Sequence, residues 1–263
     1  MIKRILSAIF LLLVFVPILI AGGRPFSVAV GVLSLLGLKE ILDLRKSHSD
    51  IPSGIILFSM CMLLFLIFYE FELHPSGISF TVLAILSIGL LFPTLLEYKK
   101  KNYETKDAFY LFAILCFLGA AFHSVIEYRT RSLFLLLYLV LTPILTDTFA
   151  YFVGKYFGKR KIAPSISPNK TVAGSLWGSI LGTLLSSCFY YFMIEKTEFY
   201  FIVFITFLLS VVGQFGDLFF SKIKRENGVK DFSNLIPGHG GVLDRFDSLI
   251  FVLLAFKILE RFI

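Results

Sequence analysis

Residues 199–220 read FYFIVFITFLLSVVGQFGDLFF, an apolar run in which Asp217 is the only charged residue. About 20 such residues form a helix long enough to cross the hydrocarbon core of a bilayer. The whole chain of 263 residues is 57% hydrophobic, which leaves too little polar surface for a water-soluble globule. The sequence therefore predicts an all-α, polytopic integral membrane protein.

Similar apolar stretches recur along the chain. We predict about nine transmembrane helices, at residues 5–21, 26–43, 53–72, 78–97, 107–126, 132–153, 172–193, 199–220 and 243–260. The first stretch follows Lys3 and Arg4 and precedes small residues, as in a signal peptide. Its apolar run is long for that role, so we interpret it as an uncleaved helix.

The distribution of Lys and Arg between these spans predicts the orientation. Seventeen of them fall on the side that holds the N-terminus, and the other side has only Arg24, Arg129, Arg131, Lys196 and Arg261. Basic loops stay in the cytoplasm. We therefore expect a multi-pass protein of the bacterial inner membrane with a cytoplasmic N-terminus. The net charge of +7 suits anionic lipid headgroups and needs no nucleic-acid partner.

Polar groups divide the chain into two parts. Residues 1–130, with about five spans, have short connections and read as a transmembrane scaffold. Residues 131–263, with about four spans, carry two polar loops at 154–171 and 221–242, which the orientation places on the cytoplasmic face. Long polar loops of this kind are usually functional, so we expect the chemistry in this second part.

Carboxylates gather at the membrane level of these loops. Asp244 and Asp247 are three residues apart at the start of a helix, which places both on one face. They form half of a site for Mg²⁺, or alternatively a helix-start pair bridged by Arg245. Asp217 at the same level favours the shared cation, because an unpaired intramembrane carboxylate is costly. Asp147 is a further candidate, or a helix-packing hydrogen-bond partner.

Basic residues supply the complementary half of a polyphosphate site. Six of them could neutralise a triphosphate, or serve as topology and headgroup residues: Lys170, Lys222, Lys224, Arg225, Lys230 and Arg245. The backbone N–H groups of residues 238–241 precede a helix and suit an anion. His239 among them could contact phosphate, donate a proton or cap the turn. Together these features indicate phosphoryl or nucleotidyl transfer to a lipid.

The order of these residues resembles a known signature. Ser221-x-x-Lys224-Arg225, then Lys230-Asp231-x-Ser233-x-x-Ile236-Pro237-x-His239-Gly240-Gly241-Val242-x-Asp244-Arg245-Phe246-Asp247, is similar to that of the phosphatidate cytidylyltransferases, also called CDP-diacylglycerol synthases. The segment from Asp147 to Thr171 resembles a second common segment of that family. There the chain departs from the family pattern, because Ala173 stands where the family usually has Glu.

The resemblance implies a reaction and roles for the residues. CTP and phosphatidate would give CDP-diacylglycerol and pyrophosphate. The cofactor would be Mg²⁺, with one or two metal ions in the site, and the protein would form a homodimer in the membrane. The metal ligands would be Asp217, Asp244 and Asp247. The other catalytic residues would be Lys224, Arg225, Lys230, Asp231, His239 and Arg245, and the substrate-binding residues would be Asp147, Lys170, Ser221, Lys222, Gly240 and Gly241.

Two other readings stay open at this stage. One is a CTP-dependent kinase or cytidylyltransferase for another membrane lipid, such as a polyprenol, phytol or an ether lipid. The other is an ion-coupled transporter, since intramembrane Asp residues often mark cation paths. Transporters usually place such groups near the midplane of inverted repeats, whereas here the charges cluster at one face.

Overall fold

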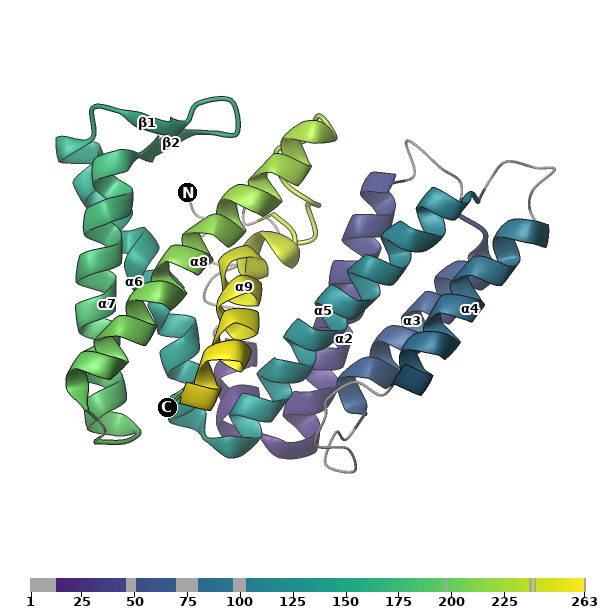
Figure 1. Cartoon of the computed structure of the whole chain (residues 1–263), viewed down its shortest axis with the longest axis horizontal. Helices are drawn as coiled ribbons and strands as arrows, with labels where there is room; N and C mark the ends of the chain where they lie inside the picture. Colours follow the sequence, from purple (N-terminus) through teal and green to yellow (C-terminus); the bar gives the residue numbers. More distant parts are fainter. Residues whose placement is uncertain are drawn as a thin grey trace. The chain divides into compact units, whose positions relative to one another are not determined.

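The computed structural model describes residues 13–45, 51–69, 80–96, 103–196, 198–236, 238 and 240–262. In these ranges the regular secondary structure is helical apart from one short hairpin (Figure 1). The helices are α2 (Gly23–Arg45), α3 (Ser53–Phe68), α4 (Phe80–Leu96), α5 (Thr105–Arg131), α6 (Leu133–Phe157), α7 (Val172–Met193), α8 (Phe199–Glu226) and α9 (Leu243–Leu259), which continues into the 3₁₀ turn η2 (Glu260–Phe262). The all-α prediction is confirmed.

Five of the described helices are long and apolar enough to cross a membrane: α2, α5, α6, α7 and α8. The helices α3 and α4 are apolar but shorter, with 16 and 17 residues, and α9 has 17. Residues 5–12 of the predicted span at 5–21 lie outside the described residues. The multi-pass prediction is therefore confirmed at the level of five helices, and the count of nine stays a prediction.

The chain forms two compact units. One joins the residues up to Phe26 to Ser124–Ile263, and the other is Ser27–His123, so the boundary falls inside α5. Within the second unit, Arg45 at the end of α2 pairs with the buried Asp107 at 2.8 Å. The other Asp107 oxygen accepts a hydrogen bond from the backbone N–H of Glu104 (3.0 Å) and so caps the start of α5.

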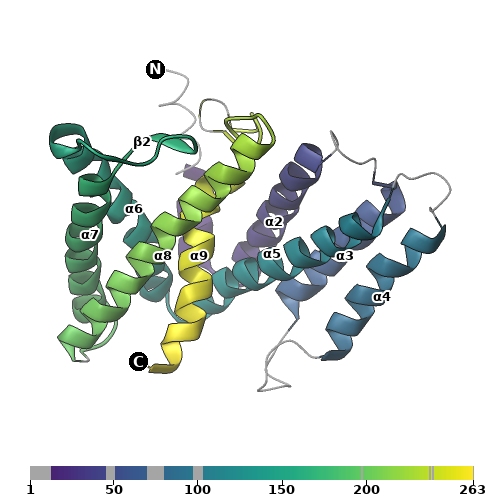
Figure 2. The same cartoon turned by 45° about the horizontal axis from the view of Figure 1, so that its top comes forward.

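In the first unit, α6 to α9 pack side by side (Figures 1 and 2). The α6–α7 contact is closest, because glycines of α7 face α6. A Cβ atom on Gly178 would lie 2.7 Å from the Thr146 carbonyl oxygen, and one on Gly182 would lie 2.7 Å from Thr146 Oγ1. Small residues let two membrane helices approach closely. This close contact fixes the orientation of α6 against α7, and with it the position of Asp147.

Buried hydroxyl groups join α6 to α8. Tyr138 shares a hydrogen bond of 2.8 Å with Thr206, and Thr146 shares one of 2.8 Å with Ser210. Hydrogen bonds of this kind hold transmembrane helices together where no water competes. They set the position of α8 along α6 and therefore that of Asp217 beside Asp147.

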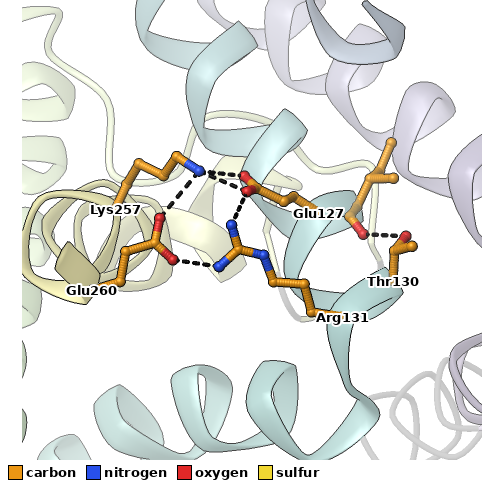
Figure 3. A network of polar contacts seen from close by, with 6 residues as sticks. Glu127, Thr130, Arg131, Lys257 and Glu260 are labelled. Atoms are coloured by element: carbon orange, nitrogen blue, oxygen red, sulfur yellow. Dashed lines mark hydrogen bonds and ion pairs between the residues drawn. The ribbon is translucent and has the colours of Figure 1, made fainter. Parts of the chain in front are cut away.

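At the end of the first unit that holds the C-terminus, four charged side chains join α5 to the last turns of the chain (Figure 3). Lys257 contacts Glu127 at 2.7 Å and Glu260 at 3.1 Å, and Arg131 contacts Glu260 at 2.7 Å and Glu127 at 2.5 Å. The network carries no net charge. It fastens the C-terminal end of α9, whose other end carries Asp244 and Asp247.

Both predicted loops are more regular than expected. The first contains an antiparallel hairpin, β1 (Lys161–Ala163) and β2 (Ser167–Thr171), which follows the end of α6 at Phe157. In the second, α8 continues to Glu226, so residues 221–226 are helical and not loop. The prediction of a loop starting at 221 was wrong because the helix outlasts its apolar run.

Candidate active site

The first candidate site is a cavity of about 340 Å³ beneath the β1–β2 hairpin, called here the hairpin cavity. Its walls come from α6, the hairpin, α7 and α8. It is lined by Asp147, Ala150, Tyr151, Ile162, Ser167, Asn169, Lys170, Thr171, Ser175, Gln214 and Asp217. Its volume falls within the range of small-molecule sites, roughly 300 to 1,000 Å³.

An ion pair between Lys170 and Asp217 crosses this cavity. Both side chains are mostly buried, with 23% and 22% of their surface exposed. Lys170 is held by its neighbour Thr171, whose Oγ1 accepts a hydrogen bond from the Gly174 N–H (3.1 Å) and caps α7. This hydrogen bond spans Ala173, the position where this chain departs from the family pattern.

The floor of the cavity is a polar contact between α7 and α8. Gln214 donates to Ser179 Oγ (2.6 Å), and Ser175 Oγ donates to the Gln214 side-chain carbonyl. These bonds fix Gln214 one helical turn before Asp217. Buried amides of this kind rigidify a site when all their groups are satisfied.

A second cavity of about 410 Å³ lies between α6 and α9, and we call it the α6–α9 cavity. It is lined by Val140, Pro143, Ile144, Asp147, Thr148, Asp244, Arg245, Asp247, Ser248 and Leu249. One wall is apolar and the other is charged. Asp147 lines both cavities, so the two spaces meet at this carboxylate.

Asp244 is fully engaged by its surroundings. Its Oδ1 pairs with Lys224 Nζ at 2.7 Å, and its Oδ2 accepts hydrogen bonds from the backbone N–H groups of Phe232 (2.9 Å) and Gly241 (2.8 Å). Lys224 is 7% exposed. Asp244 therefore fastens both the start and the end of the 227–242 segment to α9.

Asp147 and Asp247 are less committed, whereas Asp217 is ion-paired across the hairpin cavity. Asp147 has no hydrogen-bond partner within the described ranges, and Asp247 accepts only from the backbone N–H (2.7 Å) and hydroxyl of Ser248, both at Oδ1. Asp217 interacts electrostatically with both. Hard oxygen donors of this type suit Mg²⁺, so Asp147, Asp217 and Asp247 fit a metal site better than Asp244 does.

These carboxylates are not drawn together as a finished metal centre. In the part of the chain that the structure describes, no three His, Cys, Asp or Glu side chains are grouped closely enough to hold a metal ion. The predicted ligand set of Asp217, Asp244 and Asp247 therefore stays a prediction.

The predicted basic and loop residues fall into two groups. Arg225 donates to the carbonyls of Ile166 (3.4 Å) and Val229 (2.8 Å), so it ties the hairpin to the end of α8. Ser221 donates to Asp217 (3.3 Å), while Lys222 pairs with the exposed Glu226 at 3.6 Å and lines neither cavity.

The remaining predicted residues belong to the 227–242 segment and to the start of α9. Lys230 and Asp231 are exposed and line neither cavity, and Arg245 lines the α6–α9 cavity. Gly240 has φ +83° and accepts from the Ile236 N–H (2.9 Å), which closes the turn before α9. His239 lies outside the described residues.

Comparison with known proteins identifies the group to which this chain is related. The sequence profile of the Cytidylyltransferase family matches residues 2–263, nearly the whole chain. The chain belongs to the cytidylyltransferase family. Phosphatidate cytidylyltransferase from Staphylococcus aureus (strain COL) is 34% identical over 256 residues, which cover 97% of each chain. The Bacillus subtilis (strain 168) protein of the same name is 35% identical over 95% of this chain and 94% of its own length.

Sequence reasoning missed several residues of this cytidylyltransferase-family site. Tyr151 and Asn169 line the hairpin cavity, although Tyr151 was noted only as part of a shared segment. Ser175 was missed altogether. Its signal was a small polar residue one helical turn after Thr171, the first of several Ser and Thr residues along this predicted span.

Proposed function

We propose that this chain transfers the cytidylyl group of CTP to phosphatidate, forming CDP-diacylglycerol and pyrophosphate in phospholipid biosynthesis. One observation supports the proposal beyond family membership: two cavities that run in opposite directions along α6 meet at Asp147. A reaction between a water-soluble nucleotide and a membrane lipid needs a separate binding space for each substrate, and the two spaces must meet where the reacting groups come together.

The two cavities run along α6 in opposite directions. The α6–α9 cavity extends from Asp147 back to Val140, about 10 Å along the helix toward its apolar middle. The hairpin cavity extends from Asp147 to Tyr151 and the hairpin beyond the end of α6. The first direction suits the acyl chains of a lipid, and the second suits a nucleotide from the cytoplasm.

The reaction balances without an added oxidant or base. A phosphate oxygen of phosphatidate attacks the α-phosphorus of CTP, and the bond from that phosphorus to the bridging oxygen breaks as pyrophosphate leaves. A phosphate monoester is already largely ionised near neutral pH. The protein therefore has to align two anions and reduce their repulsion, a task for Lys170 and Arg245 at the two cavities.

Mg²⁺ is the cofactor that this donor set supports. Asp147, Asp217 and Asp247 would hold it, and when bound it would supply positive charge to phosphate oxygens. Asp217 would then face the positive metal ion, and Lys170, its ion-pair partner, would face the negative phosphates.

We propose a location and an assembly consistent with this site. Nine spans with a cytoplasmic N-terminus would put the hairpin and the 227–242 segment on the cytoplasmic face of a bacterial inner membrane, where CTP is available. The homodimer implied by the family resemblance belongs to the same proposal.

An assay with the purified, membrane-reconstituted protein tests the proposed activity. Labelled CTP and phosphatidate with Mg²⁺ are expected to give CDP-lipid and pyrophosphate in equal amounts, and chelation of Mg²⁺ is expected to stop both. A lipid kinase would instead release CDP and phosphorylate a lipid alcohol. Formation of CDP without any CDP-lipid would overturn the proposal.

Ile144→Trp tests the assignment of the α6–α9 cavity to the lipid. Ile144 is 52% exposed, so the larger ring is accommodated on folding but fills the apolar wall of the cavity. Overfilling an apolar site costs about 1–3 kcal/mol, so we expect KM for phosphatidate to rise roughly fivefold to a hundredfold with KM for CTP unchanged.

Leu184→Trp is the matched control for this variant. Leu184 is 45% exposed on α7 and lines neither cavity. Steady-state kinetics with short-chain phosphatidate in detergent micelles measure both constants. An equal rise in KM for CTP and for phosphatidate would contradict the division of the site.

A further inference from the structure

The two ends of the hairpin cavity differ in chemistry. At the inner end are the charged side chains of Asp147, Lys170 and Asp217. The other lining side chains are neutral, and the part of the cavity with Tyr151 from α6 and Asn169 from β2 is called here the outer end. Tyr151 lies one helical turn beyond Asp147, about 6 Å along α6 toward the hairpin.

The two outer side chains have unused binding groups. Tyr151 is 64% exposed, and its ring contacts the Phe152 ring edge-on with centroids 5.7 Å apart. Within the described residues, neither the Tyr151 hydroxyl nor the Asn169 amide has a hydrogen-bond partner. Ile162 of β1, which is 37% exposed, adds apolar surface beside them.

We propose that the outer end of the hairpin cavity binds the nucleobase, stacked on the Tyr151 ring with its polar edge on the Asn169 amide. This inference rests on the proposed use of CTP. Aromatic side chains are general stacking platforms for bases, and an amide offers both a donor and an acceptor to a base edge. With the base at this end, the triphosphate extends inward to Lys170, where the charge is complementary.

The alternative for Tyr151 is an interfacial aromatic residue that touches only lipid, because such residues are common at the membrane surface. Tyr156 provides the comparison. It lies on the same helix and is 71% exposed, but it does not line the cavity. A variant of Tyr156 therefore reproduces the loss of an exposed aromatic ring without changing the cavity.

The test compares Tyr151→Leu with Tyr156→Leu in the reconstituted enzyme. Tyr151→Leu is expected to raise KM for CTP roughly fivefold to a hundredfold, the effect of losing one stacked base, with KM for phosphatidate unchanged. Tyr151→Phe, which keeps the ring, is expected to recover most of that loss, and Asn169→Ala is expected to raise KM for CTP roughly fivefold. Tyr156→Leu is expected to match the wild type.

Inorganic tripolyphosphate, which has no base, separates the two ends of the cavity. Its inhibition constant against CTP is expected to be the same in the wild type and in Tyr151→Leu. An equal weakening of tripolyphosphate and CTP, or an unchanged KM for CTP, would overturn the proposal. Failure of the proposed function is distinguishable, because the wild-type protein would then make no CDP-lipid at all.

Discussion

Asp217→Asn is expected to lower the rate of cytidylyl transfer roughly a hundredfold or more, a typical cost of losing one electrostatic contribution to the transition state. The Asp217 carboxylate would help to hold the Mg²⁺ that reduces the repulsion between the two phosphate groups. Asp217 is ion-paired with Lys170 and interacts with Asp147 and Asp247. Its replacement leaves Lys170 without its counter-charge and removes the carboxylate between the other two. The formation of labelled CDP-lipid at saturating CTP measures the loss.

The control for this variant is Glu226→Gln on the same helix. Glu226 is an exposed acid that pairs only with Lys222 at 3.6 Å, so its loss changes surface charge without touching either cavity. Lys170→Met combined with Asp217→Asn separates two explanations. If Asp217 served only to neutralise Lys170, the double variant would regain activity, and that result would contradict a direct role for Asp217.

The apolar pattern predicted the five long helices α2, α5, α6, α7 and α8, but it misplaced the end of α8. The span predicted at 199–220 stops where the charged residues begin, yet α8 continues through Lys222, Lys224 and Arg225 to Glu226. These residues are good helix formers. The end comes at Asn227 and Gly228, where Gly228 adopts φ +69°. The Asn-Gly pair was the available signal for the helix end.

The hairpin could not be predicted from its own residues. β2 reads SPNKT, which has a Pro and no alternation of apolar and polar residues. Its pairing is supported from outside, by Arg225 of α8 holding the Ile166 carbonyl in the turn. Because Arg225 and Ile166 are 59 residues apart, the local sequence of the hairpin does not predict this contact.

The carboxylates of the site were predicted as a group, and their separate roles were not. Asp217, Asp244 and Asp247 were predicted as metal ligands with Asp147 as a further candidate, and all four line one or both of the two adjoining cavities. The engagement of Asp244 depends on the backbone N–H groups of Phe232 and Gly241. Nearly every residue has a backbone N–H group whatever its side chain, so the sequence does not show which of these groups will bind Asp244.

Asp244→Asn is expected to destabilise the protein by about 3–5 kcal/mol, as when one partner of a buried ion pair is removed, and to abolish activity. An Asn side chain keeps one acceptor and adds one donor. If its oxygen stays on the N–H groups of Phe232 and Gly241, its NH₂ group faces Lys224; if it turns, both N–H groups lose their acceptor. Thermal unfolding in detergent measures the loss of stability.

Hydrogen exchange then separates a fastening role of Asp244 from a metal-ligand role. If Asp244 served only as a metal ligand, its replacement would not change hydrogen exchange in the absence of Mg²⁺. The amides of Phe232 and Gly241 would then be as protected in Asp244→Asn as in the wild type. Because both amides donate to Asp244, we expect them to exchange faster in Asp244→Asn even without metal. Lys224→Met added to Asp244→Asn removes the opposed donor, so it is expected to restore thermal stability. Unchanged exchange together with lost Mg²⁺-dependent turnover would assign Asp244 to the metal, as the sequence first suggested.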